Sequence, residues 1–156
     1  MLVVSPDESR AYTANFSSGT ISVLNLKEKT VVKHITTGPG TEGIDLSPNG
    51  HFLYTTSVLS NRLIKIDTET LKIVGVADTD RSPIRVLATP DGQRLLVNNS
   101  AEGSLQIFSS DTLALIKRIK VGRRPIGITV PSNDFAFVAN MLDDTVSIVD
   151  LNKLIV

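Results

Sequence analysis

The chain has 156 residues, of which 41% are hydrophobic and 21% charged, as in a globular domain with its own core. Its sixteen basic and sixteen acidic side chains balance, so nothing in the net charge points to a general nucleic-acid binder. Cysteine is absent, which excludes disulfides and thiolate chemistry. No apolar run approaches the ~18 residues of a membrane span, and the segment MLVVSPDESR lacks the basic and apolar regions of a signal peptide.

A turn-containing segment repeats four times along the chain. The copies are SPDESRAYTAN from Ser5, SPNGHFLYTTS from Ser47, TPDGQRLLVNN from Thr89 and, one residue shorter in its turn, VPSNDFAFVAN. The first three are 42 residues apart (47 − 5 and 89 − 47). Each copy is expected to form a turn followed by a strand, because proline presets the second position of a type I turn and glycine suits the fourth.

Three further segments recur in phase with this turn. One precedes it (LVV, GIDL, RVLA and GITV), one follows at 20–26, 62–68, 104–110 and 145–151, and the last lies at 30–35, 71–76, 113–119 and 154–156. All are rich in strand-forming residues and bounded by turn-forming residues. We name the four expected strands of each unit A to D. The sequence thus predicts one all-β domain, 1–156, of four four-stranded antiparallel units at about 1–37, 38–79, 80–121 and 122–156.

Four-stranded units at a period near 42 residues are typical of β-propeller blades. Tryptophan is absent, so the WD dipeptide of WD40 blades is missing. The segments 5–26, 38–56 and 125–151 resemble the YVTN-type propeller repeat of YncE-like proteins. The resemblance implies a β-propeller and a periplasmic, secreted or cell-surface location.

Closed propellers of that family contain more blades than the four units counted in this chain. Three arrangements are open: part of a larger propeller, an oligomer in which two copies complete one ring, or a four-bladed ring that closes on itself. An open arc would expose sheet faces and edges that need a partner. Further blades or a second copy are therefore expected to close the ring.

Four arginines are the main candidate binding residues. Arg81, Arg123 and Arg124 lie in the D–A loops of consecutive units, and Arg85 occupies a strand-A position that is glycine in neighbouring copies. Guanidinium groups bind carboxylates and phosphates, so these residues predict an anion-binding patch. The competing interpretation is that they are solvated or paired with the acidic residues of the same face, which are Asp78, Asp80, Glu102, Asp143 and Asp144.

Three asparagines are the second candidate set. Asn15, Asn99 and Asn140 end B strands, and in a propeller the B–C and D–A loops share one face. Their amide groups are expected to form a polar ring there, beside the arginines.

Other chemical motifs are interpreted structurally. GPGTEG (38–43) matches a dinucleotide loop but is followed by a strand instead of a helix. His34 and His51 fall in different parts of a blade, and the loop aspartates follow no calcium-loop pattern. No nucleophile motif is present. No catalytic residue, metal site or cofactor is predicted.

The function expected from the sequence is a non-enzymatic propeller scaffold. It would bind a protein or a small anionic ligand on the face formed by the D–A and B–C loops. The resemblance also allows a fragment or subunit of a propeller enzyme, lactonase-like or dehydrogenase-associated. A cell-surface structural repeat protein is the third alternative.

Overall fold

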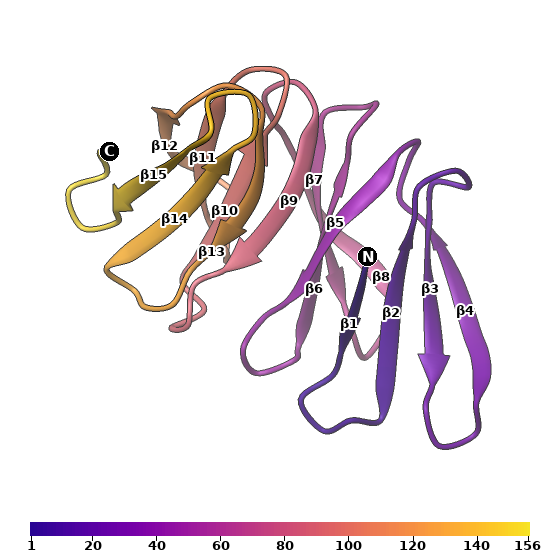
Figure 1. Ribbon diagram of the computed structural model, residues 1–156. Helices are drawn as coiled ribbons and strands as arrows, with labels where there is room; N and C mark the ends of the chain where they lie inside the picture. Colours follow the sequence, from indigo (N-terminus) through magenta and orange to yellow (C-terminus); the bar gives the residue numbers. More distant parts are fainter.

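The computed structural model describes residues 1–156 and consists of four antiparallel sheets (Figure 1). The first contains β1 (Leu2–Val4), β2 (Arg10–Asn15), β3 (Thr20–Asn25) and β4 (Thr30–Thr36). The second contains β5 (Thr41–Leu46), β6 (Phe52–Ser57), β7 (Arg62–Asp67) and β8 (Lys72–Asp78). The third contains β9 (Pro83–Ala88), β10 (Arg94–Asn99), β11 (Ser104–Ser109) and β12 (Leu115–Lys120). The fourth contains β13 (Pro125–Thr129), β14 (Phe135–Asn140) and β15 (Thr145–Asp150).

Strands pair in chain order within every sheet, which is the arrangement of a propeller blade. The prediction of an all-β fold made of propeller blades is thereby confirmed. We call the four sheets blades 1 to 4. No segment forms a helix of the length and apolarity needed to cross a membrane.

Blade 4 differs from the prediction because it has three strands instead of four. The residues expected as its strand D, 154–156, follow a turn, and only Ile155 pairs, through an isolated bridge with Asp150. Three residues are too few to repeat the ladder that β12 forms with β11.

Three apolar cores join consecutive blades. We call the face of a blade that packs on the following blade its front face, and the opposite face its back face. The first core combines the front of blade 1 with the back of blade 2: Tyr12, Ile21, Val23, Ile35, Ile44, Leu53, Ile64, Ile66 and Leu71. Equivalent cores join blades 2 and 3 and blades 3 and 4. No core joins blade 4 to blade 1, and the blades fan out side by side as an open array (Figure 1).

The innermost strands of blades 2 and 3 approach each other closely at Gly43. A Cβ at this position would lie 2.7 Å from Thr56 Oγ1 and 2.9 Å from the Cα of Arg85 in the next blade. Glycine at this position therefore permits the close packing of blades 2 and 3. Gly127, the equivalent in blade 4, has open space, with only Ala139 Cβ at 3.4 Å.

Candidate functional site

A groove of about 470 Å³ lies between blades 3 and 4, on the side of the D–A and B–C loops. Backbone hydrogen bonds hold these loops together: Val121 N donates to Gly103 O, and Met141 N donates to Arg124 O. The groove is lined by Ser82, Ser100, Ala101, Glu102, Gly103, Lys120, Val121, Gly122, Arg123, Arg124 and Leu142. Three cationic side chains and one carboxylate therefore face the same space.

The single carboxylate of the groove is already neutralised. Glu102 accepts a hydrogen bond from Arg81 Nε at 2.7 Å and lies 3.7 Å from an Arg118 nitrogen. The hydrogen bond from Arg81, with the charges of Arg81, Arg118 and Lys120, lowers the pKa of Glu102 below its ordinary value. Glu102 is therefore ionised and bound to cations outside the groove.

The cations of the groove are less fully paired. Arg123 forms an ion pair with Asp143, which also accepts a hydrogen bond from the Arg123 backbone N–H at 2.6 Å. That backbone hydrogen bond, together with the one from the guanidinium, lowers the pKa of Asp143. Lys120 and Arg124 are exposed and form no ion pair with any carboxylate. The groove thus carries positive charge that no ion pair within the chain neutralises, with Lys120 acting on Glu102 only at longer range.

Arg124 is held in an unusual backbone conformation. Its φ is 51°, in the left-handed region, and the equivalent residues of the earlier loops, Gly40 and Ser82, are also left-handed, with φ of 76° and 58°. The repeat therefore imposes this conformation, which side chains other than glycine rarely adopt. Eight other non-glycine residues of the chain, among them Lys29 and Asp144, also have a positive φ, so the conformation belongs to the repeated turns.

The four arginines predicted as one patch occupy three places. Arg123 and Arg124 line the groove, and Arg81 lies at its rim, bound to Glu102. Arg85 lies apart, on the innermost strand of blade 3, and donates to Glu42 of blade 2 at 3.1 Å. Two of the acidic partners proposed in the competing interpretation, Glu102 and Asp143, do pair with arginines of the set.

The three predicted asparagines brace hairpins within their own blades. Asn15 Nδ2 donates to Thr20 and Ser22, and Asn140 Nδ2 donates to the equivalent Thr145 and Ser147. Asn99 makes the corresponding bonds in blade 3 and is fully buried. Asn140 also packs on the groove loop, because a Cβ on Gly122 would lie 2.5 Å from its Cγ.

Sequence reasoning missed Lys120 and the acidic partner of Arg85. Lys120 ends β12 immediately before the loop that carries the arginines, so extending the candidate set into the preceding strand would have found it. Glu42 lies 43 residues from Arg85, and only the stacking of inner strands brings the two together.

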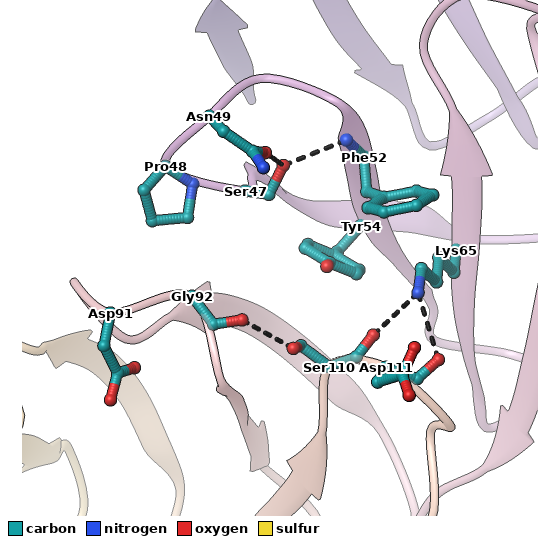
Figure 2. A pocket seen from close by; sticks show the side chains of 10 residues that line it. All are labelled: Ser47, Pro48, Asn49, Phe52, Tyr54, Lys65, Asp91, Gly92, Ser110 and Asp111. Carbon is teal, nitrogen blue, oxygen red and sulfur yellow. Dashed lines mark hydrogen bonds between the residues drawn. The ribbon is translucent and has the colours of Figure 1, made fainter.

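A second cavity, of about 250 Å³, lies between blades 2 and 3 on the opposite side, where the A–B and C–D loops meet. Lys65 is almost fully buried there, and its Nζ donates to the carbonyls of Ser110 and Asp111 at 2.8 and 3.0 Å (Figure 2). The same nitrogen lies 4.0 Å from the ring centroid of Phe52. Burial raises the pKa of Tyr54, which also lines this cavity, to about 12.

Lys65 belongs to a structural device that every blade junction contains. Arg10 of blade 1 donates to Thr68 O of blade 2, and Arg94 of blade 3 donates to Leu151 O of blade 4. Ser110 O is the equivalent carbonyl of blade 3, so each junction places one cation on the same carbonyl. We call this contact the junction cation. It explains Lys65 structurally, and a similar groove recurs between blades 1 and 2.

Asp45 gives stability a pH dependence. Burial raises its pKa, although the backbone N–H of Ala88 donates to it at 2.8 Å. As pH rises through the carboxyl range, the unfolded chain loses this proton first, so ionisation favours unfolding. Asp45→Asn removes this cost. We expect it to raise stability at pH 7 relative to the parent and to lose that advantage towards pH 3, measured by urea denaturation.

Asp7 supplies a control in which the effect of the charge on stability has the opposite sign. Hydrogen bonds from Ser5 and Ser9 lower its pKa to about 2, so its charged form favours folding. Asp7→Asn should therefore be less stable than the parent at pH 7, and the difference should shrink as pH falls towards 2. Equal pH profiles for the two variants would contradict both assignments.

The histidines do not meet. His34 Nδ1 lies 3.0 Å from Ser22 Oγ on the back of blade 1, and His51 follows the A–B turn of blade 2. No group of three or more His, Asp or Glu side chains is arranged to hold a metal ion.

Comparison with known proteins shows likeness in structure. The chain matches hydrazine synthase of Kuenenia stuttgartiensis with a TM-score of 0.92 and 16% identity, covering 99% of this chain and 46% of that one. It matches a Desulfotomaculum acetoxidans protein of unknown function with a TM-score of 0.83 and 19% identity, covering 96% and 50%. It also matches a candidate 6-phosphogluconolactonase of Bacteroides fragilis with a TM-score of 0.72 and 27% identity, covering 81% and 40%.

No protein-family model and no curated protein sequence matches the chain. The chain spans about half or less of the length of the solved structures it resembles. These likenesses support the propeller fold, whose blades the topology of the four sheets already defines.

Proposed function

We propose that the chain is a binding module of the YVTN propeller type, and that the groove between blades 3 and 4 binds a small carboxylate or phosphate. The observation that carries this proposal is the unpaired charge of Lys120 and Arg124 on one wall of the groove. A ligand anion there would gain charge-assisted hydrogen bonds without displacing an existing ion pair.

The remaining polar groups suit such a ligand. Ser82 and Ser100 also line the groove and offer hydroxyl groups to an anion or to a sugar. The name of the Bacteroides fragilis protein refers to a phosphorylated sugar lactone, whose hydrolysis gives 6-phosphogluconate, a molecule with a carboxylate, a phosphate and hydroxyl groups. We therefore choose 6-phosphogluconate as the first probe, with gluconate and inorganic phosphate to separate its two charged ends.

The test is isothermal titration calorimetry of the chain with each probe. The double variant Lys120→Gln/Arg124→Gln should weaken binding by roughly 100-fold or more, because losing one charge-assisted hydrogen bond costs roughly 10- to 100-fold and this variant removes two. Arg62→Gln is the matched control, because Arg62 is exposed and pairs with Asp78 in blade 2, outside the groove. Equal affinities of the double variant and the control would remove the groove from consideration.

The enzyme alternative is examined in the same samples. The Bacteroides fragilis likeness favours lactone hydrolysis as the activity to assay. If the chain binds the sugar acid and leaves its lactone unconverted beyond the spontaneous rate, the binding role stands. Turnover that disappears in the Lys120→Gln/Arg124→Gln variant would replace it with an enzymatic one.

A further inference from the structure

The front face of blade 4 has the composition of a blade junction but is open to solvent. Val146 is 59% exposed and Ile148 is 52% exposed. At the position of Val146 the other blades carry fully buried residues, Ile21, Leu63 and Leu105. At the position of Ile148, blades 1 and 3 carry Val23 and Ile107, which are also fully buried.

The innermost strand of blade 4 also has the residue that a blade junction requires. Gly43 permits blade 3 to approach blade 2, because a side chain there would collide with the backbone of Arg85 and Val86. Gly127 stands at the equivalent position of blade 4, and no following strand approaches it. Blade 4 therefore has the residues for a junction at its core and at its innermost strand.

The back face of blade 1 is the complementary open surface. Leu2 is 56% exposed, whereas its equivalent in blade 2, Ile44, is buried in the first core. Blade 4 carries the same residue types as blade 1 at two equivalent positions: Ala136 corresponds to Ala11, and Ser147 corresponds to Ser22. The back of blade 4 packs on blade 3 within this chain. The back of blade 1 thus repeats the pattern of a face that does form a junction.

We propose that two copies of the chain associate head to tail into one ring of eight blades, four from each copy. The front of blade 4 of each copy packs on the back of blade 1 of the other, so both open faces are covered at once. This inference goes beyond the anion groove and does not depend on it.

A second copy is the occupant that these observations favour. It supplies both missing faces in one association, and the net charge of zero sets no overall repulsion against it. Each new junction continues the pattern of the three internal ones.

The junction between copies lacks one component. The residues of blade 4 at the positions of Arg10 and Lys65 are Phe135 and Ile148, so blade 4 has no junction cation. The carbonyl that would receive it on the partner copy is that of Leu26, the equivalent of Thr68. A positive charge at position 148 should therefore be accepted beside Phe135, as Lys65 is beside Phe52. A negative charge there should be rejected.

The experiment is size-exclusion chromatography with light scattering across a concentration series. The parent chain should have twice the monomer mass of 16.8 kDa. Ile148→Glu should be a monomer, because a carboxylate would be buried against a carbonyl, whereas Ile148→Lys should remain a dimer. Val74→Glu is the control, since Val74 is an exposed apolar residue on the outer strand β8 and belongs to neither open face.

Three outcomes would overturn the proposal. The first is a parent chain of monomer mass at every concentration, and the second is a mass that rises beyond the dimer, as in an open fibre. The third is a dimer that Ile148→Glu leaves intact. Circular dichroism of each variant shows whether its blades are folded. If a variant does not fold, the mass of the parent chain still decides whether two copies associate.

Discussion

Lys65→Ile should lower the free energy of unfolding by about 2 kcal/mol, the scale for hydrogen bonds made by a buried charged group. The substitution places in blade 2 an aliphatic side chain, as blades 1 and 3 carry at this position with Val23 and Ile107, so shape is not the difficulty. Its effect comes from the carbonyls of Ser110 and Asp111, which lose their donor in a buried junction. Urea denaturation at pH 7 measures the loss.

The same junction offers a specific rescue. Blades 1 and 3 combine an arginine with an aliphatic residue, as in Arg94 and Ile107, where blade 2 combines Phe52 with Lys65. The double variant Phe52→Arg/Lys65→Ile rebuilds that combination and should recover most of the lost stability. Phe52→Arg alone should not stabilise, because it places two cations at one carbonyl. If the double variant is no more stable than Lys65→Ile, the cation is not what joins these blades.

Gly43→Ala should destabilise the chain by about 1–3 kcal/mol, the range for overpacking a tight core. The added Cβ would meet the backbone of Arg85, which cannot rotate away as the end of a side chain could. The inner strands of blades 2 and 3 would have to separate to admit it. Urea denaturation again gives the change in the free energy of unfolding.

Gly127→Ala is the matched control for this effect. It adds the same methyl group at the equivalent position, where the nearest atom lies at an ordinary contact distance of 3.4 Å. Both variants are best measured in the Ile148→Glu background, so that association of copies does not contribute. Equal losses for the two glycines would show that strand propensity, rather than close approach, sets their cost.

The fold was predictable because one local pattern is repeated four times. Turn, strand and glycine positions recur in register, and each blade pairs its strands in chain order, so local sequence specifies each sheet. The fourth strand expected in blade 4 was the short segment 154–156. Of this segment only Ile155 pairs, through a bridge with Asp150, and the repeat pattern alone does not show how many residues will pair.

The site was less predictable because its ion pairs join residues that are far apart in the sequence. The loop that carries Arg123 and Arg124 was found from the repeat, but its charge balance depends on which carboxylates the stacking brings near. Arg85 pairs with Glu42 only because the inner strands of blades 2 and 3 stack, and Glu102 is neutralised by Arg81 and by the more distant Arg118 of the same blade. Spacing along the chain does not reveal such pairs.

The order of the strands also bears on how the protein is made. Every ladder in the structure closes within one blade, and the cores join only consecutive blades. An emerging chain can therefore complete blade 1 and then add each later blade to the one before it, without waiting for distant residues. Vectorial synthesis and the architecture thus proceed in the same direction, one repeat at a time.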